Sequence, residues 1–120
     1  MPVVQCTECD FIWSSKTLPE EDLIAYYRNS FGSQRHLKGQ IVNARINAWA
    51  ITKLLNIKEV KNILDVGTGY GFLLDQLCES FGLDVTGVEL SRQEATYANV
   101  TLGLNVINSS LGESGVKNAS

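Results

Sequence analysis

Three short segments of this 120-residue chain hold residues whose types and spacing suit ligand binding. The first is the glycine-rich run Gly67-Thr68-Gly69-Tyr70-Gly71, which Asp65 precedes. Glycine has no Cβ, so such a turn lets a ligand approach the backbone closely. The second is Glu89, whose carboxylate can accept hydrogen bonds from both hydroxyls of a ribose. The third is the polar run Asn108-Ser109-Ser110. Together these segments predict a site for a nucleoside-containing ligand.

The spacing of the glycines argues against the two commonest phosphate-binding loops. The dinucleotide fingerprint G-x-G-x-x-G, started at Gly67, requires glycine at position 72, where this chain has Phe72. No Gly-Lys-Ser or Gly-Lys-Thr follows the run, so the P-loop pattern fails as well. The negative charge of Asp65 disfavours a pyrophosphate and favours a ligand that carries an ammonium group. A module that binds NAD or a similar nucleotide stays open as an alternative function.

Other chemically capable residues do not define a site. Cys6 and Cys9 are spaced C-x-x-C, but a tetrahedral zinc site needs four ligands, and only Cys78 and His36 remain, at unrelated spacings. We therefore predict no metal site. A noncatalytic interaction module that docks through this Cys turn in a metal-dependent way is kept as a second alternative. The odd number of cysteines argues against a disulfide scaffold. We assign no catalytic residue, because a lone histidine near a helix start is typical of a surface or capping position.

Composition and charge limit the classes of protein to which the chain can belong. The net charge is −3 and the isoelectric point about 5.0, whereas nonspecific binding to nucleic acid or to anionic membranes needs clustered positive charge. Hydrophobic residues make up 44% and charged residues 19%, as in globular proteins. No apolar run approaches the roughly 20 residues that span a bilayer, and no secretory signal is recognisable. We expect a cytoplasmic protein with neither a nucleic-acid nor a membrane partner.

The elements that would position the ligand-binding residues lie in the second half of the chain. Strand and helix patterns alternate there, at 62–66, 72–81, 84–89, 92–102 and 104–107. Ser91 is the expected N-cap of the second helix, with Glu94 completing a capping box. A β-α-β-α-β order predicts a parallel sheet with right-handed crossovers. Ligands bind at the carboxyl ends of the strands in such sheets, and the three ligand-binding segments fall at those ends.

The first half predicts a Cys turn followed by helices. Two short strands flank the turn, a helix runs from Pro19 to Arg28, and a longer helix spans about 34–56. The longer helix has one apolar face, formed by Leu37, Ile41, Ala44, Ala48, Ile51 and Leu55. We expect Trp49, beside this face, to be buried, and Cys78, among leucines of the later helix at 72–81, to be buried too. The chain thus divides into an N-terminal region, 1–57, and a partial α/β domain, 58–120.

Two of these segments resemble a known family. The run Ile63-Leu64-Asp65-Val66-Gly67-Thr68-Gly69-Tyr70-Gly71 resembles motif I of the class I S-adenosylmethionine-dependent methyltransferases, and Val85-Thr86-Gly87-Val88-Glu89-Leu90-Ser91 resembles their motif II. The resemblance covers about residues 58–111 and implies a Rossmann-like parallel sheet. A weaker resemblance, over Cys6-Thr7-Glu8-Cys9 and the helix that follows, is to methyltransferases with a small Cys-rich knuckle before the catalytic domain. Many of those act on small metabolites, including nucleotide sugars.

The resemblance implies a role for each matching residue in binding S-adenosylmethionine. The backbone of Gly67, Thr68, Gly69 and Gly71 would cradle the methionine portion. Asp65 would order that loop or hold the amino group of the ligand. Glu89 would bind the ribose hydroxyls, and Leu90 would lie against the adenine. Ser110 stands where the family often has an acid that contacts the adenine amino group; serine can donate or accept a hydrogen bond there but carries no charge.

The chain departs from the family in extent. The family sheet has seven strands, and three are expected here. The strand that usually supplies residues near the transferred methyl group is missing, as is the substrate-binding half. We therefore expect a truncated Rossmann-like sheet that forms the cofactor-binding part of a methyltransferase acting on a small-molecule substrate. An open edge on the first strand of the sheet predicts either pairing with a second copy of the chain or completion by a missing C-terminal half.

Overall fold

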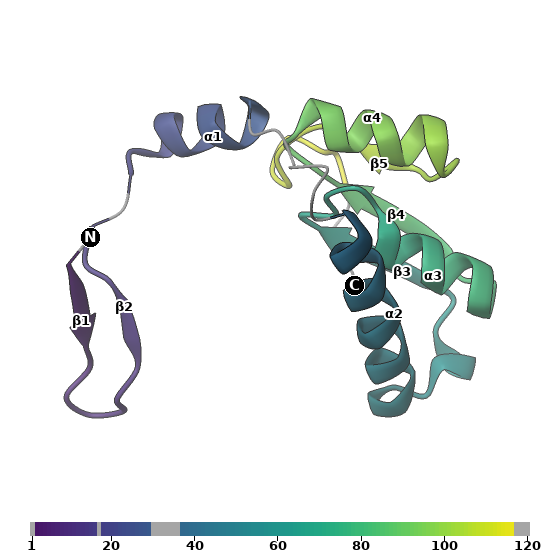
Figure 1. Ribbon diagram of the computed structural model, residues 1–120, viewed down its shortest axis with the longest axis horizontal. Helices are drawn as coiled ribbons and strands as arrows, with labels where there is room; N and C mark the ends of the chain where they lie inside the picture. The colour runs from purple at the N-terminus through teal and green to yellow at the C-terminus, as the bar shows by residue number, and fades with distance from the viewer. Residues whose placement is uncertain (1, 17, 30–36, 117–120) are drawn as a thin grey trace.

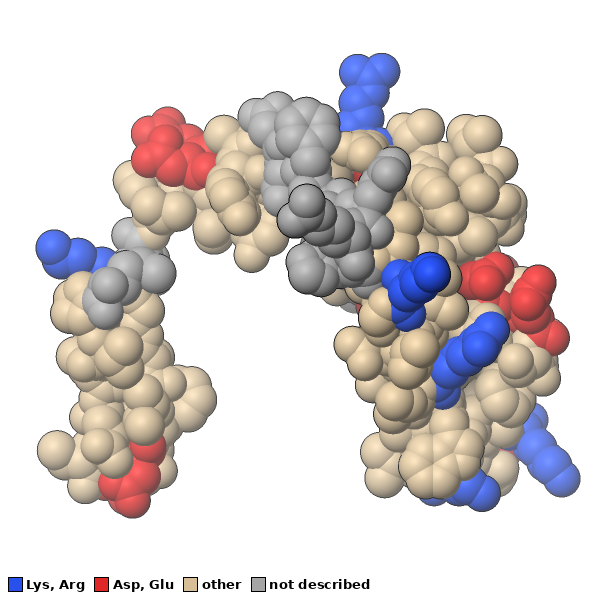
Figure 2. Space-filling view, in the orientation of Figure 1, with Lys and Arg blue, Asp and Glu red and all other residues tan. Residues whose placement is uncertain are grey.

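The computed structural model describes residues 2–16, 18–29 and 37–116. Its N-terminal part is an antiparallel hairpin of β1 (Val3–Gln5) and β2 (Ile12–Ser14), followed by helix α1 (Glu20–Asn29). In Figure 1 the hairpin lies apart from the rest of the molecule, and α1 leads from the hairpin toward the sheet and its helices. The expected strands around the Cys turn are confirmed, as is the helix start beside Pro19. Three exposed acids, visible in Figure 2, occupy the first turn of α1, where they favour the positive end of the helix dipole: Glu20, Glu21 and Asp22.

A three-stranded parallel sheet forms the body of the protein, in the order β3-β4-β5. Its strands are β3 (Asn62–Val66), β4 (Asp84–Val88) and β5 (Val106–Ile107). Helices α3 (Phe72–Phe81) and α4 (Arg92–Thr101) connect them, and a 3₁₀ turn, η2 (Ile57–Glu59), precedes β3. The expected α/β fold with a short Rossmann-like sheet is therefore confirmed. Strand β5 is shorter than the sequence predicts, because pairing with β4 begins only at Val106.

Helix α2 (Leu37–Leu54) packs against α3 and so covers one face of this sheet (Figure 1). The predicted apolar face is confirmed at its centre, where Ala44 and Ala48 are both 5% exposed, but it is wrong at its end, where Leu55 lies beyond the helix and is 51% exposed. Small side chains at these positions let the two helices approach closely. Ala48 joins the main core of buried residues, which is completed by Leu74, Leu77, Leu83 and Val85. The predicted helix start at residue 34, and with it His36, lies outside the described residues.

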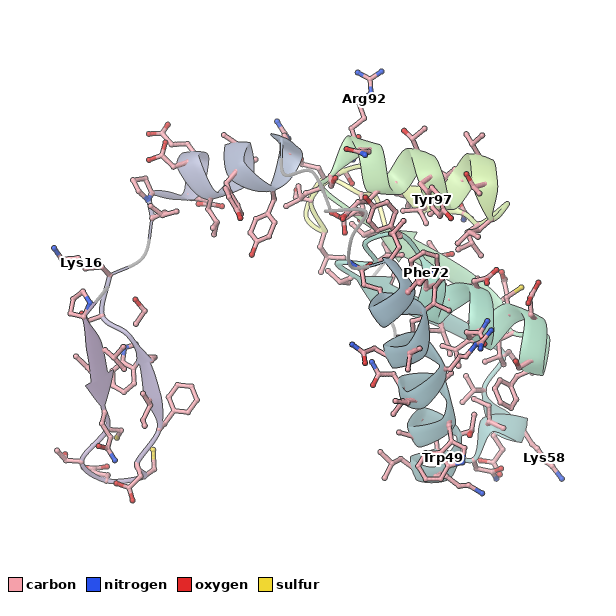
Figure 3. The ribbon with its side chains drawn as sticks, in the orientation of Figure 1. Lys16, Trp49, Lys58, Phe72, Arg92 and Tyr97 are labelled. Atoms are coloured by element: carbon pink, nitrogen blue, oxygen red, sulfur yellow. The ribbon has the colours of Figure 1, made fainter. Side chains whose placement is uncertain are left out.

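Two residues expected in the core are exposed instead. Trp49 is 63% exposed at the far end of α2, where its ring lies 6.0 Å from the Nζ of Lys53 (Figure 3). Cys78 is an exposed free thiol on α3. Each follows directly after a buried residue, Ala48 or Leu77, and one step along a helix turns the side chain by about 100°. An apolar type beside a buried face was therefore not enough to bury either side chain.

Strand β3 has a free edge within the described part of the chain, because it pairs with β4 alone. Two of its apolar residues are exposed, Leu64 by 42% and Val66 by 54%. Pairing with a second copy, or completion by further chain, stays a prediction. None of the helices in the described ranges combines the length and apolar character that a bilayer-crossing helix requires.

Gly71 offers a test of how tightly the glycine loop and α4 are packed. Its φ is +82°, and a Cβ there would lie 2.7 Å from Cδ1 of Leu104 and 3.0 Å from Cβ of Ala98. Gly71→Ala is expected to lower the free energy of unfolding by about 2–4 kcal/mol, because it combines left-handed strain with overpacking. Urea unfolding measures the change.

Gly82→Ala is the matched control for this substitution. Gly82 has a similar φ of +64°, and no atom lies within 4 Å of its Cβ position. Only the backbone strain remains, at about 1 kcal/mol. Equal losses in the two variants would contradict the packing described here.

Candidate functional site

The glycine loop between β3 and α3 is held against the carboxyl end of β4. Its glycines have left-handed backbone conformations, with φ of +81° at Gly67, +58° at Gly69 and +82° at Gly71. The N–H groups of Gly67 and Thr68 both donate to the carbonyl oxygen of Val88, at 2.8 and 3.2 Å. The loop therefore curls over the end of the neighbouring strand, where parallel sheets bind ligands.

Gly87 on β4 makes room for this loop. A Cβ on Gly87 would lie 2.6 Å from Oγ1 of Thr68, which is closer than real Cβ contacts, so the Thr68 side chain would have to move. The Thr68 hydroxyl, buried there, donates to the backbone oxygen of Asp65 at 2.9 Å. The sequence analysis gave Gly87 no role of its own, although a glycine inside a strand often marks a close approach of another backbone.

Glu89 fastens the loop to the start of α4. Its side chain is only 7% exposed. Oε2 accepts a hydrogen bond from the N–H of Gly69, and Oε1 accepts one from the N–H of Ser91, both at 2.7 Å. The Asn108 amide donates to the backbone oxygens of Glu89 and Leu90, at 2.8 and 3.0 Å, and so ties in the segment after β5.

The N-cap of α4 is confirmed, but the expected capping box is wrong. The Ser91 hydroxyl accepts from the N–H of Glu94 at 3.5 Å. In a capping box the Glu94 carboxylate would accept from the N–H of Ser91 in return. That N–H donates to Glu89 instead, and the Glu94 side chain turns toward the cavity described next.

A cavity of about 460 Å³ opens beside the loop, at the carboxyl ends of the three strands of the sheet. Its walls come from α1, β3, the glycine loop, β4, α4 and the segment after β5. The lining residues are Tyr27, Val66, Gly67, Gly69, Val88, Glu89, Leu90, Glu94, Ser109, Ser110 and Leu111. Five of the predicted cofactor-binding residues thus meet around one cavity: Gly67, Gly69, Glu89, Leu90 and Ser110.

The other three predicted residues lie around the loop but do not line this cavity. Gly71 faces Leu104 and Ala98, so its place is structural. Asp65 lies beneath the loop, half-buried. Thr68 lines a second hollow, of about 280 Å³, on the α2 side of the loop. Gly67 and Gly69 border both spaces, so a long ligand could extend past the loop from one to the other.

The structure adds residues that the sequence analysis did not assign to the ligand site. Tyr27 and Glu94 line the larger cavity. The second hollow is lined by amides of α2, Gln40, Asn43 and Asn47, whose spacing of three and four residues is a polar helical stripe that the sequence does contain. An aromatic cluster joins the middle of α4 to the loop and the start of α3: the Tyr97 ring lies edge-on to Tyr70 at 5.2 Å and to Phe72 at 5.9 Å (Figure 3).

Carboxylates dominate the electrostatics of the site. Burial raises the pKa of Asp65, a nearby Thr68 hydroxyl offsets part of this shift, and the charge of Glu89 adds to it. Burial also raises the pKa of Glu94, again with a contribution from the charge of Glu89. Among the described residues that line the larger cavity there is neither lysine nor arginine. Such a site favours ligands that are positive or that donate hydrogen bonds.

Helix α1 forms one side of the cavity. Tyr27 lines the wall, and the guanidinium of Arg28 lies 3.7 Å from a carboxylate oxygen of Glu113, on the segment after β5. Both charged side chains are more than half exposed. The Cys turn is remote from this site: Cys6 and Cys9 lie between β1 and β2 as free thiols. Within the described ranges, no group of three or more His, Cys, Asp or Glu side chains could hold a metal ion.

A family model matches a large part of the chain. Residues 46–119 match the model of the methionine biosynthesis protein MetW. Among curated proteins, no significant match was found. The matched range includes the glycine loop, Glu89 and the segment after β5, and so contains the sheet and most of the cavity wall.

Solved structures with a related fold are much longer than this chain. DesVI of Streptomyces venezuelae is 26% identical, with a TM-score of 0.47 over 72% of this chain and 32% of its own. A SAM-dependent methyltransferase from Archaeoglobus fulgidus is 23% identical, with a TM-score of 0.44 over 77% and 35%. The sugar N-methyltransferase KedS8 from Streptoalloteichus sp. ATCC 53650 is 20% identical, with a TM-score of 0.40 over 89% and 39%. The chain thus spans about a third of their length.

Removing the charge of Glu89 tests whether its two hydrogen bonds hold the glycine loop to the start of α4. In Glu89→Gln one of the two oxygens becomes an NH₂ group, which cannot accept from Gly69 or Ser91. The variant is expected to lose about 1–3 kcal/mol of stability. Amide hydrogen exchange by NMR should show lower protection at Gly69 and Ser91. Glu79→Gln, at an exposed position on α3, should change neither quantity. If the Gly69 and Ser91 amides of Glu89→Gln exchange as slowly as in the wild type, Glu89 does not hold the loop to α4.

The raised carboxyl pKa values predict how stability depends on pH. Because Asp65 and Glu94 titrate higher in the folded than in the unfolded chain, the folded state binds more protons between the ordinary and the raised pKa values. Their contribution to stability therefore falls as pH rises through that window and is constant above it. Asp65→Asn should raise Tm at neutral pH, with a gain that shrinks as the pH is lowered. The exposed control Asp84→Asn should show no such trend; a constant gain for Asp65→Asn would contradict the assignment.

Proposed function

The chain belongs to the family of the methionine biosynthesis protein MetW, and from this premise we propose that it binds S-adenosylmethionine in the cavity beside the glycine loop. We further propose that it forms the cofactor-binding part of a methyltransferase for a small-molecule acceptor. The observation that carries the proposal is the meeting of Gly67, Gly69 and Glu89 around one cavity at the carboxyl ends of the strands.

The residues around the cavity fit this ligand better than a dinucleotide. A Cβ on Gly69 would lie 3.9 Å from Oε2 of Glu94, an ordinary contact distance, so the loop leaves room beside it that a ligand can fill. The carboxylates of Glu89 and Glu94 suit ribose hydroxyls and a positively charged ligand. A pyrophosphate would meet these carboxylates with no lysine or arginine among the described lining residues to offset them. These observations support S-adenosylmethionine over NAD.

Each residue then has a binding or orienting role. The Gly67 and Gly69 backbone accommodates the methionine portion, with the α2 amides across the second hollow. Asp65 and Thr68 order the loop from beneath, and Gly71 lets α4 pack on it. Three residues hold the nucleoside: Glu89 at the ribose, Leu90 against the adenine ring and Ser110 at its amino group.

The methyl transfer itself needs more than these residues. When bound, S-adenosylmethionine supplies an electrophilic methyl group on its sulfonium. Transfer requires an acceptor held in line with that methyl group. We assign no base or acceptor-binding residue within the described chain and propose that a further part, from the same protein or a partner, supplies the acceptor site. The family name directs the choice of acceptor toward small metabolites.

Calorimetric titration with S-adenosylmethionine, and in parallel with NADH, tests this function. The wild type is expected to bind S-adenosylmethionine with a micromolar Kd and to leave NADH unbound. Gly69→Val should weaken binding at least about tenfold, because its side chain would occupy the ligand's space.

The control variant is Gly82→Val, which has a comparable positive φ away from the cavity. It carries similar backbone strain, so it should retain wild-type affinity if it remains folded, which circular dichroism checks. Binding of NADH instead of S-adenosylmethionine would overturn the proposal, as would equal losses in the two folded variants.

A further inference from the structure

Glu94 lines the cavity as a second carboxylate beside Glu89. It lies in the first turn of α4, and its Oε2 is 3.9 Å from the position that a Cβ on Gly69 would occupy. Glu89 approaches the same glycine from β4, with its Oε2 2.7 Å from the Gly69 nitrogen. Two carboxylates from different elements therefore flank one residue of the loop.

The two carboxylates differ in what they already bind. Each oxygen of Glu89 accepts a backbone N–H, so each keeps one acceptor position. Among the hydrogen bonds between described residues, none is accepted by the Glu94 carboxylate, whose pKa is raised by burial and by the charge of Glu89. Glu94 thus brings more acceptor capacity to the cavity than Glu89 does.

The first turn of α4 favours an acid, because a negative charge there interacts with the positive end of the helix dipole, but the hydrogen bonds at the helix start do not use the Glu94 carboxylate. The contribution of Glu94 to the N-cap comes from its backbone N–H, not from its carboxylate. The reciprocal position in a capping box, at the Ser91 N–H, is filled by Glu89. Arg92, at the start of the same helix, extends away from the body of the protein in Figure 3 and is not among the residues that line the cavity.

The repulsion between two neighbouring carboxylates at the edge of a cavity is best offset by a pair of hydrogen-bond donors. Burial and the charge of Glu89 both oppose ionisation of Glu94. A ribose offers two adjacent hydroxyls, each of which donates to a carboxylate without bringing a charge. A phosphate ester on either hydroxyl would be repelled.

We infer that Glu94 is a specificity-determining residue of this cavity, which accepts a hydrogen bond from one ribose hydroxyl while Glu89 accepts one from the other. The inference rests on the proposed function, because it takes the ligand to be an adenosine derivative. It assigns the recognition of the ribose to two elements, the end of β4 and the first turn of α4, rather than to Glu89 alone.

The test combines protein variants with ligand variants. The 120-residue chain is titrated calorimetrically with S-adenosylhomocysteine and with its 2′-deoxy and 3′-deoxy analogues. Glu94→Gln and Glu94→Ala are expected to bind S-adenosylhomocysteine about tenfold or more weakly than the wild type, because a hydrogen bond to a charged acceptor is lost. For one of the deoxy analogues, the wild type and both variants should bind within about twofold of one another.

The controls separate this inference from the proposed function. Glu79→Gln, on α3, should bind every ligand as the wild type does, and circular dichroism confirms that each variant is folded. If the wild type binds S-adenosylhomocysteine but the Glu94 variants bind it equally well, the inference is wrong and the proposed function stands. The inference is also wrong if the variants weaken all three ligands by the same factor, since that indicates a structural role. If the wild type binds none of the three, both the proposed function and the inference fail.

Discussion

The two hydrogen bonds that the Glu89 carboxylate accepts from backbone N–H groups join the parts on which the site depends. One reaches the glycine loop and the other the first residue before α4. A carboxylate that is only 7% exposed is costly to bury unless its oxygens are satisfied, and these two bonds satisfy them in part. The same side chain therefore sets the loop conformation and faces the cavity. Any ligand that binds to it finds the loop already in place.

The sequence predicted those features that depend on short-range patterns. The β-α-β-α-β order, the strand at Asn62–Val66 and the helix at Phe72–Phe81 follow from apolar periodicity and glycine punctuation, and the structure confirms them. The resemblance to class I S-adenosylmethionine-dependent methyltransferases is confirmed at the level of the family and of the parallel sheet. The grouping of Glu89 with Gly69 could also be anticipated, because the carboxyl ends of neighbouring parallel strands meet at one edge.

What the sequence could not supply are features decided by packing between distant segments. Trp49 and Cys78 have apolar or small side chains, but each is turned away from the contact between α2 and α3. Glu94 matched a capping box by type and spacing. The Ser91 N–H that would complete the box donates to Glu89 instead, and the Glu94 side chain lines the cavity. That competition involves residues on different elements and leaves no trace in a local pattern.

The way α1 is attached makes one side of the cavity sensitive to salt. Among the described residues, Tyr27 of α1 lines the cavity, and an exposed ion pair joins Arg28 to Glu113. An exposed ion pair contributes about 0–1 kcal/mol, and physiological salt weakens it further. That is comparable to thermal energy, whereas the sheet and its helices are held by a buried core. Within the described residues, closure of the cavity on its tyrosine side therefore depends on salt concentration in a way that the apolar core of the sheet does not.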